Sequence, residues 1–230
     1  MTGGAQRLGA AMTRALAKRG YAVAVHCRQS CAAADALVAE VVGGARRFTA
    51  ELGDPDAPSR LIADVMGAYG RLDLLVNSAA SFERTPLDTL SVEAWDRIFD
   101  VNLRAPFFLA LEASRVMTAG GSIVNFSDLA GFETWPGYIP HGLAKGAVAS
   151  MTRALARQLA PRIRVNAIAP GVVLLPDDMP AEDAERLART TPMGRHGEPG
   201  DVVRALEYLL DATFVTGQVL FIDGGRHVRH

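Results

Sequence analysis

Three ionisable residues stand at spacings that suit proton transfer. His141 and Lys145 are four residues apart, so a helix would place both on one face. Asp128 precedes His141 by thirteen residues and follows an apolar run. A histidine and a carboxylic acid can deliver a proton to a substrate atom that gains negative charge. Lys145 would disfavour a charged His141 and Asp128 would favour it, and the sequence leaves this competition open.

A second chemical feature is the glycine-rich opening TGGAQRLG, residues 2–9, which leads into a predicted helix. Backbone N–H groups at a helix N-terminus bind phosphate groups, and glycines let the ligand approach the backbone closely. This stretch therefore predicts a pyrophosphate site. On its own it also fits a plain helix-capping turn.

The elements that must position these residues alternate along the chain. Strands are predicted over residues 21–25, 46–52, 72–76, 122–126, 163–167 and 218–222, and helices over 7–19, 32–42, 58–69, 92–117, 140–160 and 202–210. The strands are almost continuously apolar, which indicates a sheet covered on both faces. We expect one α/β domain, residues 1–230, with a doubly wound parallel sheet of the Rossmann-like type.

Two segments depart from this regular pattern. No strand precedes the opening turn, although a doubly wound sheet has its central strand there. Either that first strand lies upstream of Met1, or the sheet is truncated and its cofactor site weakened. The stretch at residues 171–200 is longer than most ordered connections, so we expect it to contact substrate. It contains the predicted substrate loop, residues 172–192, with a short helix near 181–190.

Composition excludes several classes of function. The chain has 24 basic and 25 acidic side chains, so it lacks the charge that nucleic-acid binding needs, and its apolar runs are too short to span a membrane. Its only two cysteines, Cys27 and Cys31, are expected as reduced thiols, and no metal site is expected. These features predict a cytoplasmic protein with a small-molecule substrate.

Several stretches together resemble one family. In order they are TGGAQRLG, LDLLVNSAA, NLRAPFF, GSIVNFSD, the Lys145 helix, RVNAIAPG and FIDGG, and they look like the short-chain dehydrogenase/reductase family over nearly the whole chain. Arg7, Asp128, NSAASF at 77–82 and PDDMP at 176–180 are most similar to the pteridine reductases within it. The resemblance implies a Rossmann-like fold and an oxidoreductase with a dinucleotide cofactor.

The cofactor that the residues favour is NADP(H). No acidic residue follows the strand at 21–25, where NAD-preferring sites place one, and His26, Arg28 and Ser30 with Arg7 would suit a 2′-phosphate. The alternative is a solvated loop with an ordinary surface arginine. The positions that the resemblance assigns to the cofactor are Gly3, Arg7, Leu8, Gly9, His26, Arg28, Ser30, Glu51, Leu52, Asn77, Ala79, Lys145, Pro170, Gly171 and Val173.

The resemblance also assigns catalytic roles. The family places a tyrosine four residues before its lysine, and this chain has His141 there. We expect Asp128 to supply the proton, alone or through water, with His141 as an auxiliary donor. Lys145 would anchor the cofactor ribose, and Asn102 would hold a water. Phe82, Asp128 and His141 would contact the substrate, although Phe82 could also serve packing alone.

Three functions therefore stand open. The first is an NADPH-dependent reductase that transfers a hydride to a C=N bond of a pterin- or folate-like heterocycle. The second is a reductase of another carbonyl substrate, and the third is a noncatalytic NADP-binding oligomeric protein, because the usual tyrosine is His141. The resemblance further implies a homo-oligomer, tetramer or dimer, paired through the helices at 92–117 and 140–160.

Overall fold

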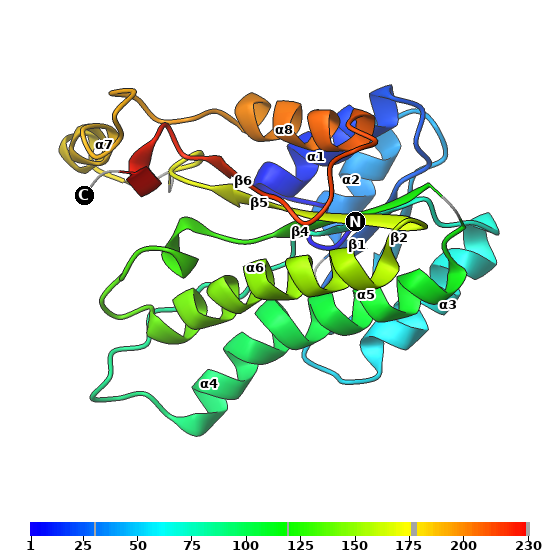
Figure 1. The fold of residues 1–230 in the computed structure, drawn as a ribbon, viewed down its shortest axis with the longest axis horizontal. Coiled ribbons are helices and arrows are strands. Elements are labelled where there is room, and N and C mark those ends of the chain that lie inside the picture. Colours follow the sequence, from blue (N-terminus) through cyan, green and yellow to red (C-terminus); the bar gives the residue numbers. More distant parts are fainter. Residues whose placement is uncertain (30, 119, 176–178, 229–230) are drawn as a thin grey trace.

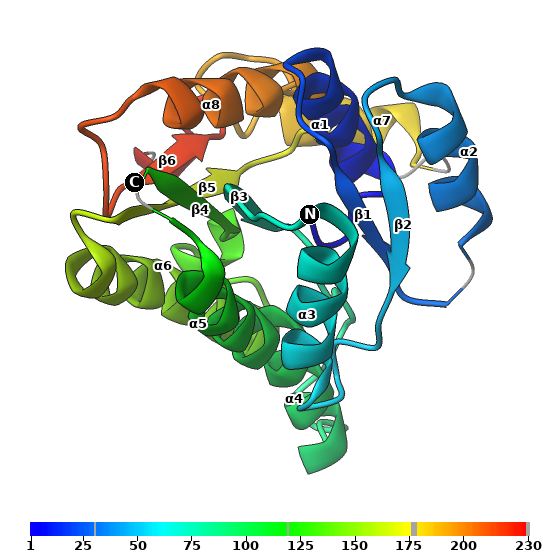
Figure 2. The same cartoon turned by 90° about the vertical axis from the view of Figure 1, so that its right-hand side faces the viewer.

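Parallel strands form the centre of the molecule, and helices cover both of its faces (Figures 1 and 2). The computed structural model describes residues 1–29, 31–118, 120–175 and 179–228. The strands are β1 Ala24–Cys27, β2 Arg46–Thr49, β3 Leu74–Asn77, β4 Gly121–Phe126, β5 Ile163–Pro170 and β6 Val219–Ile222. They form a β1–β2 pair and a β3–β4–β5–β6 sheet, all parallel. The predicted doubly wound α/β fold is confirmed.

The helices divide into two layers. One layer holds α1 Arg7–Lys18, α2 Ala32–Glu40 and α8 Pro199–Asp211, and the other holds α3 Ala57–Tyr69, α5 Ala105–Val116 and α6 Ile139–Leu159 (Figure 2). The side chains of successive residues in β4 point toward opposite helical layers, because side chains alternate across a strand. Val124 packs with the first layer and Ile123 with the second, and both are fully buried.

The shorter elements lie around this frame. α4 Val92–Phe99 continues through a π-helical turn, η1 Asp100–Arg104, into α5, so the helix predicted over 92–117 carries one wider turn. The 3₁₀ segments are η2 Leu129–Gly131 and η3 Arg226–Val228, and α7 Ala181–Ala188 lies in the predicted substrate loop. Residues 176–178 of that loop lie outside the described chain. No described helix has the length and apolar character to cross a membrane.

Strand boundaries differ from the predicted ones where pairing decides them. β1 starts at Ala24 rather than residue 21, and β2 ends at Thr49 rather than residue 52, because only Ala24–Cys27 and Arg46–Thr49 pair. β5 extends past Ala167 to Pro170, since β6 pairs along that added stretch.

The prediction of reduced thiols is wrong. Cys27 and Cys31 form a disulfide that joins the end of β1 to the start of α2. The turn between these elements brings the two Cα atoms to 5.9 Å, within the range that a disulfide can bridge. Both residues are buried in the core beside α1 and α2.

Candidate active site

A cleft of about 1360 Å³ lies at the carboxyl ends of the strands, the edge where parallel α/β sheets bind ligands. Most of the predicted site residues line it together: Gly3, Arg7, Leu8, Gly9, His26, Arg28, Glu51, Leu52, Ala79, Phe82, Asp128, His141, Lys145, Pro170, Gly171 and Val173. Asn77 and Asn102 are buried and are not among its lining residues, and Ser30 is outside the described residues.

The glycine turn packs tightly against the loop that follows β3. A Cβ atom on Gly9 would lie 2.0 Å from the Gly3 carbonyl oxygen, and one on Gly3 would lie 2.9 Å from the Cα of Ala79. Thr2 links the glycine turn to the loop after β3, because its hydroxyl accepts hydrogen bonds from the N–H groups of Ser78 and Ala79. Thr2 was not among the predicted site residues, although it directly precedes the two glycines.

The first turn of α1 faces the cleft with unused donors. Helix geometry leaves the N–H groups of the first turn without acceptors inside α1, and Gln6 provides no side-chain cap. Arg7 adopts a left-handed backbone conformation, with φ of 48°, and its guanidinium donates to the Leu174 carbonyl across the cleft. Such a conformation is costly for a residue other than glycine and is typical of functional sites. This end of α1 can bind an anion.

His26 has a different role from the predicted phosphate contact. Its Nδ1 accepts from the Gly3 N–H at 3.2 Å, so Nε2 carries the hydrogen and donates to the Ala50 carbonyl at 3.0 Å. Burial lowers the pKa of His26, because desolvation disfavours the charged ring. His26 is thus a neutral group that holds the glycine turn. The cations left at this end of the cleft are Arg7 and Arg28.

Arg28 and Glu51 form an exposed ion pair at the rim. The Arg28 Nε donates to Glu51 Oε2 at 2.5 Å, and Glu51 Oε1 accepts from the Gly53 N–H. The pair leaves Arg28 available to a second anionic partner, because its guanidinium has five donors. Leu52 beside it is buried against α3 and α5 and lines the cleft floor.

Asp128 and His141 face each other at the other end of the cleft. Asp128 Oδ2 lies 3.7 Å from His141 Nε2, while Oδ1 caps η2 by accepting from the Ala130 N–H at 2.8 Å. His141 is only 1% exposed, and its Nε2 has no hydrogen-bond partner among the described residues. Its Nδ1 lies 3.2 Å from the Ser81 carbonyl oxygen. Because that oxygen can only accept, Nδ1 carries the hydrogen and Nε2 is open to a proton.

Lys145 lies one turn further along α6 and is also buried. Its Nζ donates to the Phe126 carbonyl at 2.9 Å, at the end of β4. Burial lowers the pKa of Lys145 to about 8, and the negative charge of Asp128 partly opposes this shift. Ser127, which the sequence did not single out, donates to the Lys145 carbonyl and ties β4 to α6.

The two asparagines have supporting positions. Asn77 bridges β3 to β4, since its Nδ2 donates to Asn125 Oδ1 and to the Pro106 carbonyl. Asn102 sits in the π-helical turn, and its side chain bonds both the N–H and the carbonyl of Ser81. The π-helical turn therefore holds the carbonyl that orients His141.

Phe82 stands at the mouth of the cleft and is 56% exposed. Its ring stacks on Tyr138 with a centroid distance of 4.6 Å and meets the edge of His141 at 4.9 Å. Gly171, which also lines the cleft, must be a glycine, because a Cβ atom would lie 2.7 Å from that of Asp223. The stacked rings of Phe82 and Tyr138 form an aromatic lip beside the buried imidazole of His141. This arrangement suits a flat ligand.

Comparisons with known proteins give consistent results. A family profile described as enoyl-(acyl carrier protein) reductase matches residues 3–227. A 3-oxoacyl-[acyl-carrier-protein] reductase of Synechocystis is 34% identical over 98% of this chain and 94% of that protein.

Two solved structures are similar over almost the full length. FolM alternative dihydrofolate reductase 1 from Brucella canis, complexed with NADP, has a TM-score of 0.91 and 35% identity, covering 100% of this chain and 93% of that one. A blue fluorescent protein from a metagenomic library, in complex with NADPH, has a TM-score of 0.91 and 31% identity, covering 98% and 95%.

Proposed function

The chain belongs to the short-chain dehydrogenase/reductase family, and on this basis we propose that it is an NADPH-dependent reductase of a pterin- or folate-like heterocycle. The observation that carries the proposal is the Asp128–His141 pair beside buried Lys145 in the cleft. The similarity to a dihydrofolate reductase complexed with NADP supports it. A carboxylic acid is a suitable proton donor for a ring nitrogen.

The cofactor end of the cleft fits an NADP(H) molecule. The uncapped first turn of α1 offers backbone donors to the pyrophosphate, and Arg7 and Arg28 offer charge-assisted contacts to the 2′-phosphate. A 2′-phosphate would share the Arg28 guanidinium with the Glu51 carboxylate, which is already paired with it. Lys145 would hold the ribose from the opposite end, and Pro170, Gly171 and Val173 would cover the nicotinamide amide.

When bound, NADPH supplies a hydride, which adds to the carbon of the substrate C=N bond while the nitrogen takes a proton. We assign that proton to Asp128 Oδ2, directly or through one water. The Asp128 side chain is 29% exposed, so solvent can return the proton after each turnover. Its second oxygen is held by the Ala130 N–H, which fixes the direction of the donating oxygen.

His141 would act as the auxiliary donor. Its ring is oriented by the Ser81 carbonyl, so a proton taken up at Nε2 faces Asp128 Oδ2. This arrangement lets His141 reload Asp128 or stabilise its carboxylate after transfer. Asn102 supports the step by holding Ser81, in addition to the water that the family pattern assigns to it. Phe82 would stack on the flat substrate ring.

A second candidate is the reduction of a carbonyl compound such as a 3-oxoacyl thioester. The observation that favours it is the similarity to 3-oxoacyl-[acyl-carrier-protein] reductases of Synechocystis and Staphylococcus aureus. Against it stands the absence of the tyrosine that the family places at His141. We therefore rank it below reduction of a heterocycle.

The test measures turnover with NADPH on dihydropterin, dihydrofolate and a 3-oxoacyl thioester. Turnover is monitored through the loss of the reduced-nicotinamide absorbance. We expect turnover with the first two. Phe82→Leu should raise the KM for the heterocycle several-fold and leave NADPH affinity unchanged. Phe132→Leu is a matched control, since Phe132 is also partly exposed but contacts Phe221 instead of the aromatic lip.

Two other outcomes would contradict the proposal. Turnover with the thioester alone would establish the second candidate. Tight NADPH binding without turnover on any of the three compounds would favour a noncatalytic NADP-binding protein.

A further inference from the structure

The Cys27–Cys31 disulfide closes the loop that carries Arg28. Cys27, Arg28 and Gln29 all line the cleft in which we place NADPH. Arg28 is the residue of this loop that we assign to the 2′-phosphate, so the inference below rests on the proposed NADPH site. The Arg28 side chain is 70% exposed and reaches Glu51 across the rim of the cleft. The disulfide is therefore adjacent in the chain to a cofactor contact.

Both ends of this loop are held by backbone pairing that does not depend on the sulfur atoms. Cys27 pairs with Thr49 in the parallel β1–β2 ladder, and its carbonyl accepts from the Ala50 N–H at 3.2 Å. Cys31 directly precedes α2, and its carbonyl accepts from the Asp35 N–H at 2.8 Å. We therefore expect β1 and α2 to keep their positions when the disulfide is opened.

The loop between these ends has few other constraints. No hydrogen bond joins the backbone of Arg28 or Gln29 to another described residue. The Arg28–Glu51 ion pair is exposed, and exposed pairs contribute little to stability. The disulfide is thus the main constraint on the position of Arg28. Opening it would increase the number of backbone conformations that NADPH binding must restrict.

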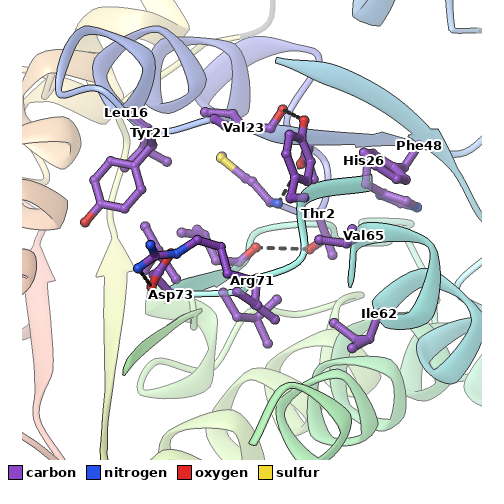
Figure 3. Close-up of a pocket in the computed structure, with 18 of the residues that line it drawn as sticks. Thr2, Leu16, Tyr21, Val23, His26, Phe48, Ile62, Val65, Arg71 and Asp73 are labelled. Carbon is purple, nitrogen blue, oxygen red and sulfur yellow. Dashed lines mark hydrogen bonds and ion pairs between the residues drawn. The ribbon is translucent and has the colours of Figure 1, made fainter. Parts of the chain in front are cut away.

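The disulfide is accessible from the cleft. Cys27 is among the lining residues of the cleft and Cys31 is not. A second cavity, of about 620 Å³, lies between β1 and β3, and it is lined by His26 and Phe48 but by neither cysteine (Figure 3). A small dithiol would therefore approach the Cys27 sulfur through the space that we assign to NADPH.

Thiol–disulfide exchange at this site releases Cys31 in surroundings that favour a thiolate. A thiolate of the dithiol attacks Cys27 Sγ, which forms a mixed disulfide and breaks the bond to Cys31 Sγ. Cys31 is the N-cap residue of α2, where the helix dipole favours negative charge, and its Sγ lies 3.6 Å from the Thr49 hydroxyl oxygen. The second thiol of the reductant then displaces Cys27. The dithiol is oxidised to a cyclic disulfide, and the protein takes up two electrons and two protons.

Both sulfur atoms have a polar neighbour that suits the reduced form. Cys27 Sγ lies 3.7 Å from the Phe48 carbonyl oxygen, which can accept a hydrogen bond from a thiol. The Thr49 hydroxyl beside Cys31 Sγ can donate or accept. Buried polar groups without partners destabilise a fold, and these neighbours avoid that cost after reduction. The reduced form is therefore compatible with the same fold.

We propose that the Cys27–Cys31 disulfide is a redox switch for NADPH binding. The oxidised form holds Arg28 at the rim of the cleft, where it contacts the 2′-phosphate. Reduction by a dithiol frees the loop and weakens that contact. NADH lacks the 2′-phosphate, so the switch changes the preference of the protein between the two cofactors.

The test measures the Kd for NADPH and for NADH by fluorescence, with the oxidised protein and with protein reduced by dithiothreitol. Alkylation and mass spectrometry establish the redox state of both cysteines in each sample. We expect reduction to raise the Kd for NADPH at least about fivefold, because binding must then order at least about one more backbone residue. The Kd for NADH should change less than about twofold, since it makes no contact with a 2′-phosphate site.

Two variants provide matched controls. The double variant Cys27→Ser, Cys31→Ser should bind NADPH as weakly as the reduced natural chain and should not respond to dithiothreitol. Arg28→Met keeps the disulfide but lacks the guanidinium. Its affinity for NADPH should be low in both redox states, and reduction should change it no more than it changes the affinity for NADH.

Thermodynamic linkage provides a second, independent measurement. If the oxidised form binds NADPH more tightly by some factor, saturating NADPH must stabilise the disulfide against reduction by the same factor. In buffers of reduced and oxidised dithiothreitol, the ratio of reduced to oxidised protein should fall at least about fivefold with NADPH. With NADH this ratio should stay nearly constant.

Three results would overturn the proposal. The first is an unchanged Kd for NADPH after reduction, and the second is an equal rise in Kd for both cofactors, which would mean that the disulfide supports the cleft as a whole. The third is a redox response of NADPH binding that persists in Arg28→Met. Failure of the proposed cofactor site gives a different result, because neither redox form would then bind NADPH. None of these readouts requires turnover, so the identity of the substrate does not affect them.

Discussion

Lys145 carries its charge in a buried position, so the folding stability of the protein depends on pH in a defined direction. Its pKa of about 8 lies below the ordinary value of 10.5 because of desolvation. Below about pH 8 both folded and unfolded chains hold the proton, and the folded state bears the full cost of the buried cation. Between about 8 and 10.5 the folded state releases the proton while the unfolded state keeps it, so this group makes stability rise with pH.

This titration can be observed directly, because the chain has only two lysines, Lys18 and Lys145. In protein labelled with ¹³C at lysine Cε, we expect one resonance to titrate with a midpoint near pH 8, and the variant Lys18→Arg assigns it to Lys145. Asp128→Asn should lower the midpoint, since Asp128 raises the pKa of Lys145. A midpoint above pH 10 for Lys145 would contradict the buried placement.

At this scale the sequence was informative about residue types and less so about contacts. The spacing of Asp128, His141 and Lys145 predicted a common site, and all three line one cleft. The orientation of His141 could not be predicted, because the carbonyl that holds it belongs to Ser81, sixty residues earlier. The neutral role of His26 was missed for the same reason, since its partners lie at Gly3 and Ala50.

Among the elements, α1 depends on a glycine that no other residue can replace. Gly9→Ala would place a methyl group 2.0 Å from the Gly3 carbonyl oxygen, so we expect a loss of more than about 2 kcal/mol in unfolding free energy and weaker NADPH binding. Gly67→Ala in α3 is the matched control, because no described atom beyond its own helix lies within 4 Å of the added Cβ atom. It should stabilise by about 0.5–1 kcal/mol. Urea unfolding measures both, and equal effects would refute the tight packing of the turn.

The disulfide makes a separate prediction for the loop after β1. Cys27 and Cys31 enclose a very short loop, for which chain entropy gives a stabilisation of about 2 kcal/mol. Reduction should therefore lower the unfolding free energy by about that amount. The double variant Cys27→Ser, Cys31→Ser should have the lower stability and no response to reductant. An unchanged denaturation midpoint of the natural chain under reductant would contradict this account.

Element types were predictable, but their ends were not. The apolar periodicity located every strand of the described chain, whereas the bounds of β1 and β5 follow from partners far along the sequence. The π-helical turn at Asp100–Arg104 interrupts a stretch whose composition is ordinary for a helix. It serves to place Asn102 against Ser81, a contact between distant segments.

For the whole molecule, the second helical layer exposes apolar surface that predicts self-association. A groove of about 330 Å³ on α4, α5 and α6 is lined almost entirely by apolar atoms. Phe107, which lines it, and the next residue, Phe108, are each about 40% exposed. We expect a homo-oligomer through this layer. Light scattering should give a multiple of the chain mass, and Phe107→Asp with Phe108→Ser should reduce it. A single-chain mass for the natural protein would refute the expectation.

The sequence predicted a parallel sheet but not its division into a pair of strands and a sheet of four. The cavity of about 620 Å³ between β1 and β3 was not predictable, because it depends on packing from α1 and α3 that no local pattern encodes.

The role of Asp128 is tested most directly by the rate of NADPH oxidation by dihydropterin in Asp128→Asn, measured in a single turnover together with NADPH affinity by fluorescence. Asparagine can still accept from the Ala130 N–H, so the cleft should keep its shape. We predict a rate at least about 100-fold lower than that of the natural chain, with the Kd for NADPH within about twofold of the natural value. A rate equal to that of the natural chain would contradict Asp128 as the proton donor.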